Sequence, residues 1–408
     1  MPPPSSVNAT LSAVEQVLDE HSANLVAFRR QLHAHPELSG QEYATTEAVL
    51  TQLSALGLRP VRLRCGTGLV CDIGAGDPVV ALRADIDALA MPDGKEVSYR
   101  SLVNGVAHAC GHDVHTTVLL GVAMALLRVL TGSAVTGTVR LIFEPSEESV
   151  PGGAVDVVAE GWLDGVAAIF GLHCDPKLDV GLVAVRPGAI TSAADLVQIR
   201  LKGPGGHTAR PHLTVDLLGA MGRILTEVPV RLEARRPGSL RLVFGSAHAG
   251  DAGNVIPAEG LVRGTLRTPD RDAWALAPGL VEEAVADALE GTGATWEIEH
   301  HRGVPPVVND PAATDVVAAC ARQALGKHAV AVAEHSWGGD SFSWYTEKVP
   351  GSYFRLGVHA TAPAGPRLDL HASTFDVDEA AIGHGVKVLA ATAVAMLDQL
   401  TTTTESAD

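Results

Sequence analysis

Short apolar segments with the composition of buried β-strands alternate with helical segments through the first half of this 408-residue chain. Strand-like runs occur at Val79 to Arg83, Val139 to Phe143 and Val166 to Leu172, and a helical pattern covers His115 to Leu130. Strands that are apolar along their whole length are buried on both faces, which requires helices on the two sides of a sheet. The first half therefore predicts an α/β layered domain.

A different pattern begins near Leu196 and ends at about Glu299. The order strand, helix, strand, strand, helix, strand is typical of a small α+β (ferredoxin-like) sandwich. After Pro305 and Pro306 the α/β pattern returns. We therefore expect a catalytic domain in two pieces, residues 1–190 and 305–408, with a central mixed sheet flanked by helices. An inserted α+β domain is expected over residues 191–304.

Charge and hydropathy exclude several classes of protein. A formal net charge of −17 argues against a nucleic-acid partner, because binding phosphates needs a basic surface. The longest apolar run, Val118 to Leu127, is too short to span a membrane. The start of the chain lacks the pattern of an export signal, and five scattered cysteines are typical of reduced thiols. We therefore expect a cytoplasmic protein.

The segment from His108 to His115, HACGHDVH, is the densest group of metal-binding side chains. The Cys110 thiolate and the His112 imidazole stand two residues apart on a loop with a glycine, so both can face one ion of the zinc type. Asp113 can orient an imidazole. A buried cysteine beside incidental histidines is the alternative, but so many ligands within eight positions favour a metal site.

Acids and histidines also follow the strand-like runs. Asp85 and Asp87 come after the first run, Glu147 and Glu148 after the second, and His173 closes the third. Taken singly, each is a turn residue, a solvated helix start or a structural histidine. The carboxyl ends of parallel strands meet at one sheet edge, however, and a late loop adds His371. We therefore expect enough ligands for two ions, with one acid free to take a proton from water.

Nine motifs occur in a fixed order from about Phe28 to Phe375: FRRQLHAHPELSGQE, RADIDALAMPD, HACGHDVHTT, FEPSEES, GLHCDP, GPGGHTARPH, NVIP, GTLR and LHASTF. In this order they resemble the M20 metallopeptidases, specifically the amidohydrolase branch of hippurate hydrolases, N-acyl amino acid amidohydrolases and auxin-conjugate hydrolases. The resemblance covers nearly the whole chain.

The resemblance implies a site with two divalent metal ions, Zn²⁺ or Mn²⁺. It makes Glu147 the general base and Asp87 the acid that positions or tunes a ligand. The implied metal ligands are Cys110, His112, Glu148, His173 and His371.

The inserted domain is similar to the family's lid, which implies a homodimer formed through this domain. By the same resemblance, His207 holds the substrate carbonyl oxygen, in its own subunit or in the neighbouring one. Asn254 and Arg267 resemble residues that bind the substrate carboxylate. Without the family these three would be interpreted as a loop histidine, a turn residue and a solvated strand end.

Two positions depart from the family pattern. Asp340 and Ser341 precede Phe342 where the family often has a Glu-Asp pair, which leaves the role of this loop open. Cys174 stands where the family often has an apolar residue, beside the expected ligand His173.

The expected activity is metal-dependent cleavage of the amide bond of small N-acyl amino acids. A dipeptidase or carboxypeptidase of the same family is the nearest alternative. A non-catalytic metal- or ligand-binding protein on this scaffold is the second. A cysteine-dependent hydrolase using Cys110 and His112 is the third, and it predicts inactivation by alkylation but indifference to chelators.

Overall fold

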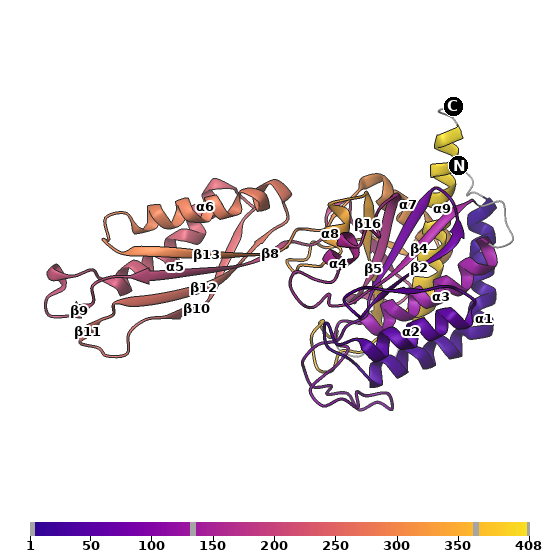
Figure 1. Cartoon of the computed structure of the whole chain (residues 1–408), viewed down its shortest axis with the longest axis horizontal. Helices are drawn as coiled ribbons and strands as arrows, with labels where there is room; N and C mark the ends of the chain where they lie inside the picture. Colours follow the sequence, from indigo (N-terminus) through magenta and orange to yellow (C-terminus); the bar gives the residue numbers. More distant parts are fainter. Residues whose placement is uncertain (1–4, 131–135, 362–366, 406–408) are drawn as a thin grey trace. The chain divides into compact units, whose positions relative to one another are not determined.

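The computed structural model describes residues 5–130, 136–361 and 367–405, and these form two compact units. Unit 1 comprises residues 1–190, 308–334 and 341–408, and unit 2 comprises residues 191–307 and 335–340. The second unit therefore takes in a short return segment, residues 335–340, in addition to the region around the expected insertion. Figure 1 labels many of the elements of both units.

Unit 1 is built on an eight-stranded mixed sheet with the order β1-β2-β4-β3-β5-β16-β6-β15. Neighbours β4, β3, β5 and β16 are parallel, whereas β2 and β6 run antiparallel to β4 and β16. The strands are β1 (Val61–Arg62), β2 (Leu69–Ala75), β3 (Val79–Asp85), β4 (Gly137–Glu144), β5 (Val166–Asp179), β6 (Val183–Val185), β15 (Val330–Val332) and β16 (Gly351–His359). The predicted mixed α/β fold is thus confirmed.

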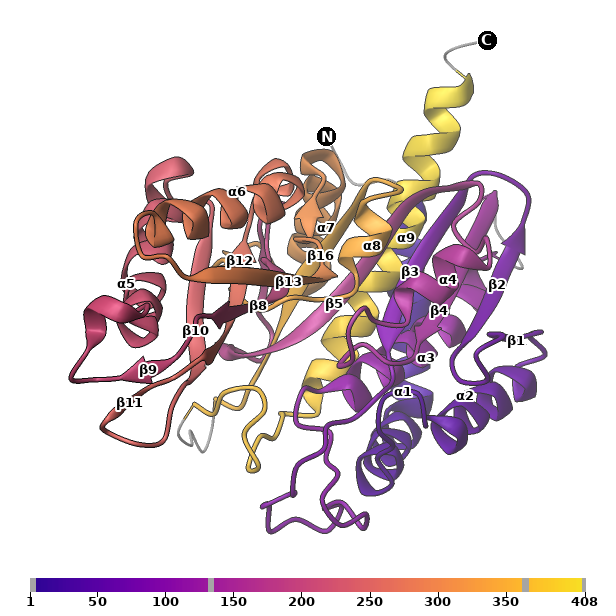
Figure 2. The same cartoon turned by 60° about the vertical axis from the view of Figure 1, so that its left-hand side comes forward.

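Helices cover both faces of this sheet. On one face α1, α3, α7 and α9 pack against one another, while the short α4 and α8 lie on the other face (Figures 1 and 2). Their bounds are α1 (Ser5–Ala34), α2 (Tyr43–Ala55), α3 (His112–Leu130), α4 (Ala154–Ala159), α7 (Pro311–Leu325), α8 (Ser343–Thr346) and α9 (Ala380–Glu405). A short pair, β7 (Gly188–Ala189) with β14 (Val308–Asn309), completes the unit.

Two helices of unit 1 are long and apolar enough, by length and composition, to cross a membrane. They are His112–Leu130 and the segment Ala380–Thr402 of α9. In each, 78% of the apolar window is buried inside the protein. Their apolar composition is explained by this burial, because both contribute to the core between the sheet and its helices.

Unit 2 has a four-stranded antiparallel sheet with the order β10-β12-β8-β13, covered on one face by α5 and α6. Buried and exposed residues alternate along β8 and β12, as expected for a sheet with one face in the core. The elements are β8 (Ala193–Lys202), β9 (Gly206–His207), a 3-10 turn (Pro211–Leu213), α5 (Leu217–Arg235), β10 (Arg241–His248), β11 (Val255–Ile256), β12 (Glu259–Thr268), α6 (Arg271–Leu289) and β13 (Thr295–Val304). Its role as a lid and dimerisation domain stays a prediction.

Candidate metal centre

The parallel strands bring the sequence candidates of unit 1 to one edge of the sheet. Asp85, the last residue of β3, lies in register with Glu144, the last residue of β4. Asp87 follows the first of these strands and Glu147 and Glu148 follow the second. His173 lies within β5, the other neighbour of β3. Three separate chain segments thus deliver acids and an imidazole to the same place.

Two loops complete the group. Cys110 and His112 lie where the chain turns into α3, and Gly111 between them has a φ of +89°. A Cβ atom at this glycine would lie 2.9 Å from the Cys174 side chain, so the turn needs glycine on two counts. The late loop is anchored here because the His371 amide donates a hydrogen bond to the Ala109 carbonyl at 2.8 Å.

The donor atoms converge into overlapping groups, in each of which all atoms lie within 4.8 Å of one another. The Cys110 Sγ is 3.3 Å from His173 Nε2, and Glu148 Oε1 is 3.2 Å from His371 Nε2 and 3.9 Å from His112 Nε2. The groups are Cys110 with His112 and His173, Cys110 with Glu148 and His371, and His112 with Glu147 and Glu148. The structure therefore brings together all five expected ligands and the expected base.

The hydrogen bonds of the His112 and His173 imidazoles leave the Nε2 atom of each ring available to bind a cation. His112 Nδ1 lies 3.0 Å from the Asp87 carbonyl and 3.1 Å from its Oδ1, and His173 Nδ1 lies 2.7 Å from the Cys174 carbonyl. Each Nδ1 must then carry the proton, so each Nε2 presents a lone pair to the cluster. Within the described part of the chain, His112 Nε2 is buried and lacks a hydrogen-bond partner. A divalent cation fits these donors.

His115 belongs to a fourth group, with Asp85 and His112, but its ring nitrogens are already engaged. Its Nδ1 is 2.5 Å from Asp85 Oδ1, and its Nε2 accepts the Cys174 amide at 2.8 Å. Asp85 in turn pairs with the buried Arg83 at 2.5 Å. His115 therefore supports the strand that carries His173 and is not itself placed as a ligand. Its position one turn along α3 from His112 was the only sequence signal for this role.

Asp87 holds two of the expected ligands at once. Besides the His112 imidazole, its carboxylate accepts the Glu148 amide at 2.9 Å and the Ser39 hydroxyl at 2.7 Å. Burial opposes ionisation, but the hydrogen bonds from the His112 imidazole and the Glu148 amide outweigh it and lower the pKa of Asp87. Asp87 is thus an ionised carboxylate that orients the ligands.

Ser341 links the expected base to a buried ion pair. Its amide donates to Glu147 Oε1 at 3.2 Å, and its hydroxyl donates to Glu144 at 2.5 Å and accepts from Arg83 at 3.1 Å. Glu144 also accepts from Arg83 Nε at 2.6 Å. The loop that departs from the family pattern is therefore tied to the sheet. Glu144, which precedes the site acids by three residues, is structural.

Cys174 serves the site through its backbone. Its amide and carbonyl bind His115 and His173, while its buried thiol lies 3.8 Å from the Gly111 carbonyl. Burial, with the charges of Asp113 and Asp85, holds the pKa of this thiol well above its usual range. The side chain therefore packs as a neutral group.

The remaining candidates lie in unit 2. His207 and Asn254 are neighbours, because His207 pairs with Val255 across β9 and β11 and the Thr208 amide donates to the Asn254 carbonyl at 3.2 Å. His207 is exposed, and its Nδ1 accepts the Ala209 amide at 3.1 Å. Arg267 lies on β12 and donates to the Trp337 carbonyl at 3.3 Å. The roles assigned to them stay predictions.

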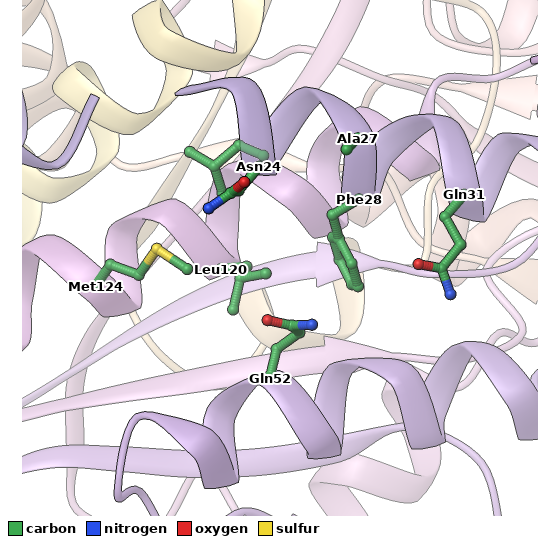
Figure 3. A pocket seen from close by; sticks show the side chains of 8 residues that line it. Asn24, Ala27, Phe28, Gln31, Gln52, Leu120 and Met124 are labelled. Atoms are coloured by element: carbon green, nitrogen blue, oxygen red, sulfur yellow. The ribbon is translucent and has the colours of Figure 1, made fainter. Parts of the chain in front are cut away.

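A groove of about 340 Å³ lies between α1, α2 and α3 (Figure 3). Phe28, Gln52 and Met124 are among its lining residues. No candidate ligand or base lines it, so the groove is separate from the metal centre.

Residues 81–395 match the model of the peptidase family M20/M25/M40. The chain belongs to this family. Among its M20 relatives is the N-acetylcysteine deacetylase of Bacillus subtilis, 35% identical over 382 residues that cover 92% of this chain and 97% of the relative. The YXEP protein of Bacillus subtilis, described as a dinuclear metal-binding peptidase of the M20 family, superimposes with a TM-score of 0.82 at 32% identity, covering 93% of this chain and 99% of the other.

A third relative is longer than this chain. A Rhodococcus jostii protein named as a glutamate–cysteine ligase is 46% identical over 379 residues, which are 92% of this chain but 46% of that protein.

The resemblance to M20 metallopeptidases predicted from the motifs is confirmed, and the chain is an M20-family hydrolase.

Proposed function

We propose that this M20 hydrolase cleaves the amide bond of N-acyl amino acids, hippurate-like or related conjugates, with Glu147 as general base. The observation that carries the proposal is the set of five convergent donors with the Glu147 carboxylate beside them. A relative named for removing an acetyl group from an amino acid supports this substrate class.

Cys110, His112, Glu148, His173 and His371 would hold two divalent cations, Zn²⁺ or Mn²⁺. A thiolate and imidazoles favour zinc-type ions, and a carboxylate suits manganese as well. Bound there, such cations supply Lewis acidity, which polarises a carbonyl oxygen and makes water a stronger acid. Asp87 would keep His112 and Glu148 in place through its hydrogen bonds.

The remaining steps belong to side chains of this chain. Glu147 takes a proton from the attacking water and passes it to the leaving amine, and the Ser341 amide keeps its carboxylate in position. His207 would stabilise the negative charge on the carbonyl oxygen, and losing such a donor costs about 3 kcal/mol of activation energy. Asn254 and Arg267 would bind the amino-acid carboxylate through charge-assisted contacts.

Among the alternatives, a dipeptidase or carboxypeptidase keeps the same machinery, and a relative described as a peptidase favours it. A non-catalytic binding protein would be expected to lack a metal ligand or the general base. In this chain the five expected ligands and Glu147 lie together. A cysteine nucleophile needs a depressed pKa. Burial and the charge of Glu148 instead raise the pKa of the Cys110 thiol well above its usual range, which disfavours a thiolate nucleophile.

The same proposal includes a cytoplasmic homodimer formed through unit 2, with neither a nucleic-acid nor a membrane partner. The net charge of −17 and the burial of both apolar helices support the last two points.

The test is hydrolysis of a panel of N-acetyl, N-benzoyl and indoleacetyl amino acids, with unacylated dipeptides as the competing class. Activity should disappear when the metal is stripped and return with Zn²⁺ or Mn²⁺. Faster turnover of dipeptides than of all acyl amino acids would assign a peptidase instead. Inactivation by alkylation together with indifference to chelators would assign a cysteine hydrolase.

A further inference from the structure

Arg355 lies beside the candidate metal centre and has no part in the site described above. Arg355 lies on β16 and is 9% exposed. It pairs in register with His173 on the parallel neighbour β5 and with Ala184 on β6. Paired residues on adjacent strands project from the same face of a sheet. Arg355 and the expected ligand His173 are therefore side by side.

In the part of the chain that the structure describes, no acid balances the charge of Arg355. Among the described residues, no acid lies within ion-pair distance of its guanidinium. Its neighbour is the Tyr353 ring, with the guanidinium carbon 5.6 Å from the ring centre. This ring is held in place by stacking on Phe342 at 4.6 Å. A cation–π contact attracts a cation but supplies no opposite charge.

The other buried arginines of the described chain behave differently. Arg83 pairs with Asp85 at 2.5 Å and Glu144 at 2.6 Å, and Arg29 pairs with Asp113 at 2.7 Å. Buried arginines are expected to be paired in this way, because an uncompensated buried charge is costly. Arg355 breaks the rule next to a cluster expected to hold further cations. Its described neighbours therefore supply no anion within ion-pair distance.

We propose that Arg355 is an anion subsite of the active centre, which binds a second carboxylate of the substrate. This inference rests on the proposed function and narrows it to N-acyl amino acids with a carboxylate besides the α-carboxylate. The planar guanidinium matches a carboxylate with two parallel hydrogen bonds. The second carboxylate belongs either to the amino-acid side chain or to a dicarboxylic acyl group. Both have the same chemistry at Arg355.

Two matched substrate pairs test the subsite and distinguish the two sources. N-acetylglutamate is compared with N-acetylglutamine, and N-succinylalanine with its terminal amide, by kcat/KM on the metal-loaded enzyme. The wild type should prefer the charged member of one pair by about 10- to 100-fold, the size of a charge-assisted contact. The pair that shows the preference identifies the source. Equal rates within both pairs would overturn the proposal.

Two variants assign the preference to this side chain. Arg355→Leu should abolish the preference for the charged substrate, while the neutral substrates are still cleaved. Arg355→Lys should retain part of this preference, because lysine keeps the positive charge but lacks the planar guanidinium that forms two parallel hydrogen bonds. A preference that survives in Arg355→Leu would also overturn the proposal. If Arg355→Leu does not fold, by circular dichroism and metal content, Arg355→Lys alone must reduce the preference.

A binding measurement separates failure of the subsite from failure of the proposed function. If no member of either pair is hydrolysed, the substrate class is wrong, and calorimetry of succinate and acetate on the metal-loaded protein tests Arg355 by itself. Succinate should bind at least about 10-fold more tightly than acetate to the wild type and lose this advantage in Arg355→Leu. Equal affinities in the wild type would refute the subsite.

Discussion

Replacing Asp87 by asparagine should weaken metal binding because no orientation of the new amide satisfies both ligands. In the wild type, Oδ1 accepts from His112 Nδ1 at 3.1 Å, while Oδ2 accepts from the Glu148 amide at 2.9 Å and from Ser39 at 2.7 Å. An NH₂ group in place of Oδ1 would face the His112 N–H. In place of Oδ2, it would face the Glu148 N–H.

The size of the effect follows from this mismatch. Asp87 is 1% exposed, so water cannot replace the lost acceptor. A buried donor left without a partner costs about 1–3 kcal/mol, a factor of about 5 to 150 in binding. His112 keeps a second acceptor, the Asp87 carbonyl at 3.0 Å, which favours the lower half of that range. Mutation of a residue that hydrogen-bonds a metal ligand typically lowers metal affinity by about 10- to 100-fold. We expect a loss of about 10- to 50-fold, within both ranges.

The assay is competition for Zn²⁺ or Mn²⁺ between the protein and a fluorescent chelator. Ser39→Ala is the matched control, because it removes one hydrogen bond to the same carboxylate but touches neither ligand. The metal affinity of Ser39→Ala should stay within about threefold of the wild type. This loss is much smaller than the loss expected for Asp87→Asn. An Asp87→Asn variant with wild-type affinity would refute the reasoning. An equal loss in the control would assign the effect to loosening of the loop.

Three further changes test other parts of the structure. Glu147→Gln should retain its metals while turnover falls by about 100-fold or more, and near-normal kcat would remove Glu147 from the reaction. Cys110→Ser should lower the metal content measured by elemental analysis, and an unchanged content would count against the ligand set. Burial alone would raise the pKa of Asp195, but its hydrogen bonds to His300 and the Gly303 amide lower it. The ionised carboxylate therefore stabilises the fold above the unfolded-state pKa of about 3.9, and this contribution is lost as pH falls toward the folded-state pKa. In urea unfolding, Asp195→Asn should cost about 1–3 kcal/mol at pH 7 and progressively less below pH 4, and a pH-independent difference would contradict this interpretation.

Much of the α/β unit could be predicted from local pattern. The runs Val79 to Arg83, Val139 to Phe143 and Val166 to Leu172 all lie within observed strands, β3, β4 and β5. Strands buried on both faces must be apolar along their length, which makes them visible in a sequence. The edge strands escaped prediction. β1 and β15 are only two and three residues long, too short for a periodic pattern.

The candidate ligands could be named from the sequence because strand ends in an α/β sheet share an edge and because motif order is specific. The residues that hold these ligands in place could not be named from the sequence. Ser39, His115 and Ser341 act through hydrogen bonds to residues 48, 30 and 194 positions away in the chain. Nothing about a serine in a loop indicates which distant carboxylate it will meet.

Local chemistry thus determined the central strands β3, β4 and β5, where acids and imidazoles leave them, and which family the chain resembles. Tertiary structure decided which imidazole nitrogen stays free, which of the nearby glutamates is structural, and that Arg355 is buried without an opposite charge among the described residues. The physical reason is that side-chain type and backbone periodicity are properties of neighbouring residues. Protonation state, pairing and burial depend instead on atoms that only folding brings within a few ångströms.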